Sequence, residues 1–147
     1  MTLPQRPYLP IGSLAAAIGY PTAGGSYDAT QLRELLNAVG LPALADRLDE
    51  EAHWSRMLSL GEQQRIGIAR AILHAPDFLL LDEATASLDE PSEAALYKLL
   101  HERLPNATIV SIGHRSTLAA FHKRRLTLTR DGDRYRVEAA PLAAAAS

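Results

Sequence analysis

The spacing of apolar residues predicts a helix over residues 28–39. Its apolar positions recur every three or four residues and are Leu32, Leu35, Leu36 and Val39. Asp28 or Thr30 is the expected N-cap, because a short oxygen-bearing side chain accepts hydrogen bonds from the first amides of a helix. Gly40 is the expected stop. The pattern indicates a helix with one face against a core.

A longer helix is predicted to begin at Ser59 and to end before Pro76, with apolar residues again at helical spacing. Ser59 and Glu62 have the spacing of a capping box. Proline and glycine interrupt the chain before residue 28, so only a short helix around residues 13–18 is expected there. Another short helix is expected at about residues 42–48.

Two short apolar runs, at residues 78–81 and 107–112, are typical of strands buried on both faces of a sheet. A helix from about Pro91 to Leu104 separates them. This order of strand, helix and strand predicts a parallel sheet and an α/β fold. In such sheets ligands bind beyond the carboxyl ends of the strands, where Asp82, Glu83 and His114 occur.

The C-terminal part shows a different pattern. Residues 116–121 are expected to form a short helix. Polar and apolar residues alternate over residues 125–129 and 134–138 around Asp131-Gly132, which predicts a β-hairpin. The alanine-rich tail, residues 139–147, is expected to be disordered.

Composition narrows the classes of function. The chain has 147 residues, 47% of them hydrophobic, and a net charge of −2, which gives no reason to expect a nucleic-acid partner. It has no cysteine, which excludes disulfides and thiolate metal sites. No apolar run approaches the roughly 20 residues of a membrane span, and no signal peptide is recognisable. Membrane association would therefore require a partner or a further part of the chain.

Asp82 and Glu83 are the first candidates for chemistry, because they end an apolar strand. Mg²⁺ prefers carboxylate oxygens together with water and phosphate oxygens, and phosphoryl transfer to water needs a group that orients the attacking water. An aspartate on the metal and a glutamate on the water would supply both roles. For this pair alone, an ordinary acidic loop is an equally good interpretation.

Residues Ser59, Leu60, Gly61 and Glu62 form a second candidate site, because the start of a helix presents unpaired amides to phosphate. The alternative is a capping box that serves only the helix. Neither lysine, Lys98 or Lys123, follows a glycine, so the sequence contains no phosphate-binding G-x-x-x-x-G-K-[ST] loop.

These segments together resemble the nucleotide-binding domain of ABC transporters, from the Q-loop onward. Residues 58–62 resemble the signature motif, and Phe78–Asp82 resemble the Walker B strand. The remaining correspondences are Gln5 with the Q-loop glutamine, Glu83 with the catalytic glutamate, Ser87–Asp89 with the D-loop and His114 with the H-loop histidine. The resemblance extends to about residue 138 and implies a truncated P-loop NTPase-type sheet with an α-helical signature subdomain.

The resemblance also implies roles. Glu83 and His114 would be catalytic, and Asp82 and Gln5 would bind Mg²⁺. The residues expected to contact ATP are Gln5, Ser59, Leu60, Gly61, Glu62 and Asp89. The expected partners are a second ABC ATPase subunit and a transporter membrane domain, which implies a cytoplasmic location at the membrane. Residues of about 6–75 would form the helical subdomain and 76–138 the Walker B and H-loop core.

Longer sequence strings around these motifs narrow the resemblance to a subfamily. The strings LPQRPYLPIGSL and LDEATASLDE look like the group that contains SbmA/BacA-like peptide and cobalamin uptake systems and relatives of the peroxisomal acyl-CoA exporters. Leu60 stands where the signature motif usually has glycine, and Glu62 stands where it often has glutamine. The Walker A half of the domain is missing, and the strand beside the one that precedes His114 is missing with it. Turnover by this chain alone is therefore not expected.

Two alternative functions remain open. A non-enzymatic module that pairs with an intact ABC ATPase would also lack Walker A. Half of a chromosome-type ABC ATPase, divided by a coiled coil, would explain a separate C-terminal half, but the sequence has no heptad run.

Overall fold

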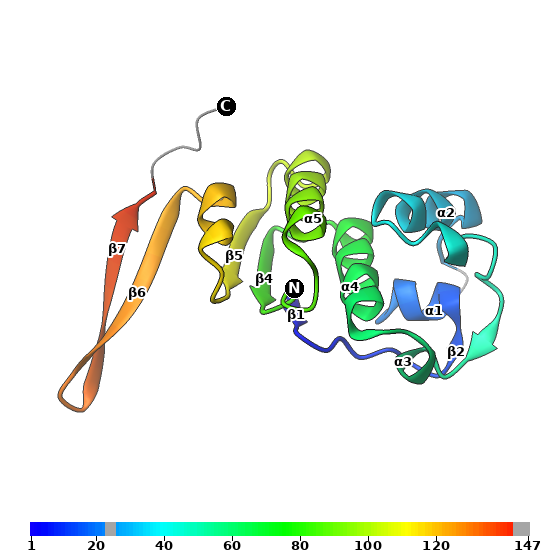
Figure 1. Cartoon of the computed structure of the whole chain (residues 1–147). Coiled ribbons are helices and arrows are strands. Elements are labelled where there is room, and N and C mark those ends of the chain that lie inside the picture. Colours follow the sequence, from blue (N-terminus) through cyan, green and yellow to red (C-terminus); the bar gives the residue numbers. More distant parts are fainter. Residues whose placement is uncertain (23–25, 143–147) are drawn as a thin grey trace. The chain divides into compact units, whose positions relative to one another are not determined.

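The computed structural model describes residues 1–22 and 26–142 and divides into two compact units, Met1–Ile112 and Gly113–Ser147 (Figure 1). The predicted boundary between residues 75 and 76 lies inside the first unit. No helix in the described ranges is both long and apolar enough to cross a membrane.

A three-stranded parallel sheet organises the first unit, and it confirms the predicted α/β architecture. Its strands are β1 (Thr2–Pro4), β4 (Phe78–Asp82) and β5 (Thr108–Ile112), in the order β1-β4-β5. In register, Pro4 lies beside Asp82, and Asp82 lies beside Ile112. The carboxyl ends of the strands therefore meet at one edge, and β5 is an edge strand of this sheet.

The expectation of strands buried on both faces is wrong for β4 and β5. Leu79 and Leu81 are buried, whereas Phe78 is 71% exposed and Ile112 is 51% exposed. Successive side chains of a strand point to opposite faces. The sheet therefore has one covered face and one open face.

Helix α4 (Leu60–His74) is the centre of the first unit and contacts β1, α5 (Glu90–Arg103) and two smaller helices (Figure 1). The predicted bounds of α4 and α5 are close to the observed ones. The core under the sheet consists of fully buried side chains from α4, β4 and α5, namely Ile66, Ile68, Leu79, Leu81, Leu96 and Leu100. Burial of each such side chain contributes about 1.5–3 kcal/mol.

The two smaller helices are α1 (Leu14–Gly19) and α2 (Ala29–Ala38). Both were predicted, and the Asp28 side chain caps α2 by accepting a hydrogen bond from the Gln31 amide. Leu32, Leu35 and Leu36 of α2 are buried, as the periodicity predicts. The helix expected over residues 42–48 is wrong. Only a short 3-10 helix, η1 (Pro42–Leu44), forms there, and the chain continues through turns with hydrogen bonds between residues three apart.

Four short elements of the first unit were not predicted: β1, β2 (Gly12–Ser13), β3 (Glu51–Ala52) and α3 (Trp54–Met57). Each is too short to show a period in sequence. Strands β2 and β3 pair in antiparallel fashion, and the Trp54 indole Nε1 donates a hydrogen bond of 2.9 Å to the Gly12 carbonyl. This contact closes the helical part of the unit on a fully buried aromatic ring.

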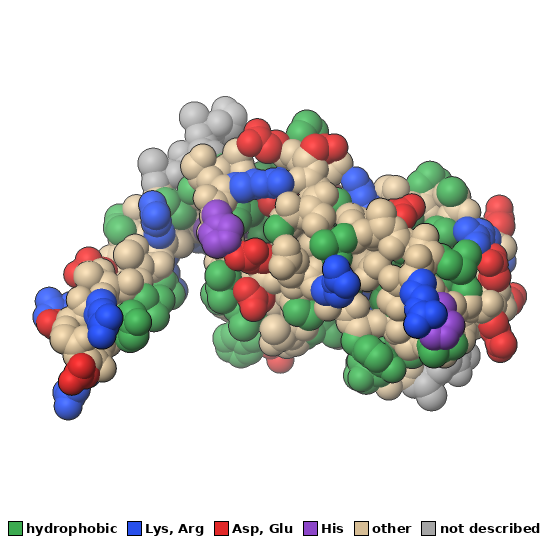
Figure 2. All heavy atoms as spheres, turned by 60° about the horizontal axis from the view of Figure 1, so that its bottom comes forward, with side chains coloured by type: hydrophobic (Ala, Val, Ile, Leu, Met, Phe, Trp, Pro, Cys, Tyr) green, Lys and Arg blue, Asp and Glu red, His purple; other side chains and the backbone are tan. Residues whose placement is uncertain are grey.

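The second unit contains η2 (Ser116–Phe121), a 3-10 helix, and the hairpin of β6 (Arg124–Asp131) and β7 (Arg134–Pro141). The hairpin was predicted. However, β7 continues to Pro141, so the prediction that the chain is disordered from residue 139 onward is wrong for residues 139–141. Strand pairing with β6 orders these residues. Residues 143–147 lie outside the described residues. Both hydrophobic and charged side chains reach the surface along the hairpin (Figure 2).

Candidate functional site

The sheet edge brings together two of the predicted metal ligands. Pro4 is the strand neighbour of Asp82, so Gln5 begins its loop beside the carboxyl end of β4. Both residues are exposed, and carboxylate and amide oxygens are hard ligands that suit Mg²⁺. In the described ranges no group of three or more His, Asp or Glu side chains could hold a metal ion. A role of Gln5 and Asp82 in binding Mg²⁺ stays a prediction.

Glu83 has an unusual backbone. Its φ of 52° lies in the left-handed region, which residues other than glycine rarely adopt. The Glu83 amide donates a hydrogen bond of 2.9 Å to the Ile112 carbonyl, and the Glu83 carbonyl accepts from the Ala86 amide at 3.1 Å. The turn thus takes Glu83 out of the strand direction at the sheet edge. Such strained residues persist where surrounding structure fixes them, and they cluster at functional sites.

The predicted capping box is present at the start of α4. The Ser59 amide donates to the Glu62 carboxylate at 2.7 Å, and the Glu62 amide donates to the Ser59 hydroxyl oxygen at 3.3 Å. These bonds satisfy two of the amides that a helix start leaves without intrahelical partners. The amides of Leu60 and Gly61 are the others of this first turn. Because the Ser59 hydroxyl only accepts in this pair, it keeps its own hydrogen for another acceptor.

Gly61 lies close to the loop that follows β4. A Cβ atom added at Gly61 would come within 3.3 Å of a Leu88 methyl group and within 3.5 Å of the Ser87 carbonyl oxygen. A side chain here would lie tightly against the buried Leu88. The contact places the start of α4 beside the segment Ser87–Asp89.

Asp89 has a structural role that the sequence analysis did not assign. Its carboxylate accepts a hydrogen bond of 2.7 Å from the Ser92 amide and caps α5. The N-cap position explains an aspartate before Glu90-Pro91 without any ligand. Its contact with ATP stays a prediction.

His114 lies in the second unit and is exposed. Its expected role at the phosphate also stays a prediction.

Two polar side chains of α4, the buried Gln63 and the half-buried Arg65, were not singled out from the sequence. Gln63 donates to the carbonyls of Ser55 and Leu58 at 3.0 and 2.9 Å. Arg65 donates to the Val39 carbonyl and to the Ser92 hydroxyl at 2.7 and 2.8 Å. These bonds fasten α4 to the segments before it and to α5.

Arg70 is 5% exposed and donates hydrogen bonds to the carbonyls of Tyr8 and Ala17. Its guanidinium also lies over the Tyr20 ring, 5.3 Å from the centroid. Burial lowers the pKa of Arg70 to about 10, so it stays protonated at neutral pH. The loop that follows Gln5 is thereby attached to α4 and α1.

A second buried network supports the turn at Glu83. The Thr85 hydroxyl donates to the buried Glu93 carboxylate at 2.7 Å. The Tyr97 hydroxyl donates to Ser111 of β5 at 2.8 Å, and burial raises the pKa of Tyr97. These bonds join α5 to the segment after β4 and to β5.

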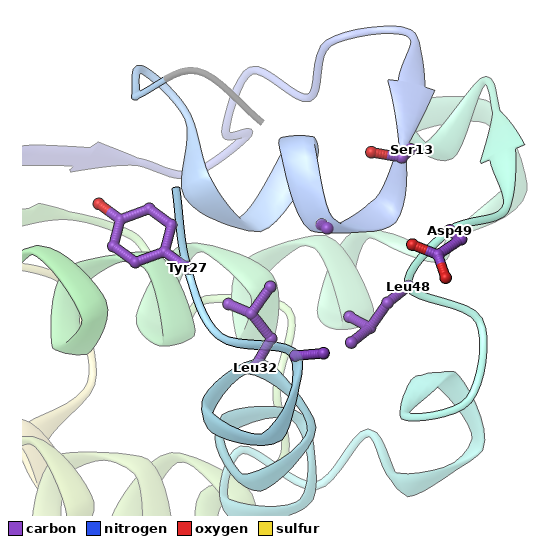
Figure 3. Close-up of a pocket in the computed structure, with 7 residues that line it drawn as sticks. Ser13, Tyr27, Leu32, Leu48 and Asp49 are labelled. Atoms are coloured by element: carbon purple, nitrogen blue, oxygen red, sulfur yellow. The ribbon is translucent and has the colours of Figure 1, made fainter. Parts of the chain in front are cut away.

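A shallow pocket of about 160 Å³ opens in the helical part, away from the predicted site residues (Figure 3). It is lined by Ser13, Ala15, Tyr27, Ala29, Leu32, Leu48 and Asp49. The Ser13 oxygen caps α1, and the Tyr27 hydroxyl bonds to Thr22 and His74. Of the polar side chains that line the pocket, Ser13 and Tyr27 are thus used by the fold, and the single exposed carboxylate of Asp49 does not make a second candidate site.

The sequence profile of the family described as ABC transporter matches residues 5–86, more than half of the chain. An uncharacterized ABC transporter ATP-binding protein of Haemophilus influenzae is 50% identical over 130 residues, which cover 88% of this chain and 22% of that protein. ABC transporter D family member 2, chloroplastic, of Arabidopsis thaliana is 38% identical, and the match covers 86% and 22%. A lysosomal cobalamin transporter of Mus musculus is 35% identical with the same coverage.

A solved structure, that of a bacterial Atm1-family ABC exporter with ATP bound, resembles the fold with a TM-score of 0.69 and 28% identity. The match covers 85% of this chain and 22% of that one. It confirms the predicted P-loop NTPase-type fold. The chain spans about a fifth of the length of these relatives. The named relatives confirm the predicted resemblance to the peroxisomal-type group, and this chain belongs to the ABC transporter family, of which it carries part of the ATP-binding domain.

Proposed function

We propose that this chain presents its signature segment to an ATP site whose nucleotide a partner ABC ATPase holds, and that its own Walker B carboxylates belong to the opposite ATP site, which has no phosphate-binding loop in this sequence. The observation that carries the proposal is the sheet edge, where Gln5, Asp82 and the strained Glu83 come together. The start of α4 supplies a second, separate phosphate-facing segment.

Each residue has a proposed part. Asp82 and Gln5 would hold Mg²⁺ with the phosphates, and Glu83 would orient or deprotonate the attacking water. Ser59 would donate its hydroxyl hydrogen to the γ-phosphate of a nucleotide held by the partner, and the Gly61 amide would approach the same group. His114 would add a hydrogen bond to the transferring phosphate. Bound Mg²⁺ would neutralise charge on the phosphates.

The chain alone should bind ATP weakly and turn it over at no measurable rate. A P-loop lysine and its backbone amides normally hold the phosphates, and the sequence has no G-x-x-x-x-G-K-[ST] pattern. Without that cradle, Asp82 and Glu83 lack a positioned phosphate. The proposed partners are a complete ABC ATPase subunit and a transporter membrane domain, with the chain on the cytoplasmic side.

A trans-rescue assay tests the proposal. The ATPase domain of the Haemophilus influenzae relative is disabled by replacing its own signature serine with arginine, and this chain is added. Restored turnover supports the proposal. Ser59→Arg in this chain should abolish the rescue, whereas Glu83→Gln should leave it intact, because the partner supplies the glutamate at that site. No rescue, or rescue that survives Ser59→Arg, would contradict the proposal.

A non-enzymatic module that regulates an intact ABC ATPase is the second candidate, and the lack of a P-loop pattern favours it equally. The same assay separates the two functions. A module of this kind would change the turnover of the unmodified relative without rescuing the disabled one.

A further inference from the structure

The side chain of Gln64 bridges two loops of the candidate site. Its Nε2 donates a hydrogen bond of 2.9 Å to the Gln5 carbonyl, and its Oε1 accepts one of 3.0 Å from the Ser87 amide. Gln64 is 2% exposed, so water does not compete for these bonds. In sequence, Gln64 lies 59 residues from Gln5 and 23 residues from Ser87.

The orientation of the carboxamide is set by its partners. A backbone carbonyl can only accept and a backbone amide can only donate. The reversed carboxamide would place its oxygen against the Gln5 carbonyl and its NH₂ against the Ser87 amide, which would lose both bonds.

We propose that Gln64 is a positioning residue that couples the backbone at Gln5 to the backbone at Ser87, so that the two loops shift together. Movement of either loop beyond hydrogen-bond reach would leave a buried amide group without its partner, which is costly. The least costly displacement is therefore one in which both loops follow the carboxamide.

Coupling would matter for the reaction because Gln5 follows Pro4, the strand neighbour of Asp82, while Ser87 leads to Asp89 and lies near the start of α4. A change at the metal-binding edge would then reach the signature segment through one side chain. This consequence rests on the proposed function, but the bridge itself does not. Its test therefore uses no nucleotide.

Nuclear magnetic resonance on the 147-residue chain tests the coupling. Leu88→Ala perturbs the Ser87 loop, and the Gln5 carbonyl ¹³C shift reports the response at the other end. We expect a response in the wild-type background and none when Gln64→Met is also present, because methionine fills similar space without either hydrogen bond. Gln64→Met alone should speed exchange of the Ser87 amide about five- to tenfold, the effect of losing one buried hydrogen bond.

Gln63→Met is the matched control, because the neighbouring carboxamide binds Ser55 and Leu58 instead. It should leave the Gln5 response to Leu88→Ala unchanged. A response that survives Gln64→Met, or that Gln63→Met removes equally, would overturn the coupling. In the unsubstituted chain, the Gln64 side-chain NH₂ should exchange slowly. Exchange as fast as that of an exposed amide would overturn the bridge even if the variants fail to fold.

Discussion

Arg70 donates a hydrogen bond of 3.0 Å from its Nη2 to the carbonyl oxygen of Tyr8, which lies three residues beyond Gln5. The loop that contains Gln5 and Tyr8 is therefore held by α4 at two points, through Gln64 and through Arg70. A helix whose first turn forms the signature segment thus also determines the course of the Gln5 loop. The two candidate segments, far apart in sequence, share one rigid support.

Arg70→Lys should destabilise the chain by about 1–3 kcal/mol, because an ammonium group cannot reach both carbonyls in the geometry of a guanidinium and leaves a buried acceptor unpaired. Urea unfolding followed by circular dichroism measures this change. Arg33→Lys is the control, because Arg33 is exposed and makes only a 4.0 Å contact with Asp46. Equal effects of the two substitutions would contradict the structural role of Arg70.

Glu83→Gly should be more stable than Glu83→Ala by about 1 kcal/mol, because glycine adopts the left-handed backbone at position 83 without steric cost. Both variants lose the carboxylate, so their difference isolates the backbone term. The free energy of unfolding in urea gives the comparison. At Glu102, in α5, the same pair should show the opposite order, since glycine destabilises a helix. If Glu83→Ala proves more stable than Glu83→Gly, the left-handed backbone conformation at position 83 is contradicted.

Ser59→Ala should reduce stability by about 1 kcal/mol, the usual cost of removing an N-cap side chain. Ser59→Thr keeps the hydroxyl and should lie close to the wild type. Thermal unfolding of the three proteins measures the effect. A loss with threonine as large as that with alanine would mean that the capping box does not stabilise α4.

The buried Tyr97 should make the free energy of unfolding depend on pH in the alkaline range. Its folded pKa is raised by burial, so above pH 10 the unfolded chain loses this proton before the folded chain does, and stability falls as pH rises. Arg70 acts in the opposite direction above about pH 10, because its folded pKa is lowered. Urea unfolding at pH 9–11 should therefore show a smaller loss of stability for Tyr97→Phe than for the wild type. Tyr135→Phe, at an exposed ring, is the matched control substitution.

The periodic elements could be predicted from sequence because their signals are local. The apolar face of residues 28–39, the capping box at Ser59 and the Asp131-Gly132 turn each lie within a few residues. Short elements could not be predicted in this way. Strand β1 has three residues and exists because it pairs with β4, 78 residues further along the chain.

Burial of the sheet was predicted wrongly for a related reason. Apolar composition at residues 78–81 is the same whether one face or both are covered, and only the tertiary arrangement decides. The candidate site divides in the same manner. Asp82, Glu83 and Ser59 belong to local motifs that the sequence shows directly. The hydrogen bonds of Gln64 and Arg70 join segments that are distant in sequence, so no local pattern predicts them.

If the proposal holds, this chain does not bind the phosphates of ATP by itself, and its signature segment acts only on a nucleotide held by a partner. Isothermal titration calorimetry of Mg²⁺-ATP into the Glu83→Gln variant of the purified chain tests it most directly, because turnover is blocked and only binding is measured. We expect no saturable binding up to about 1 mM ATP. A dissociation constant in the micromolar range would contradict it, because the chain would then hold the phosphates without a partner.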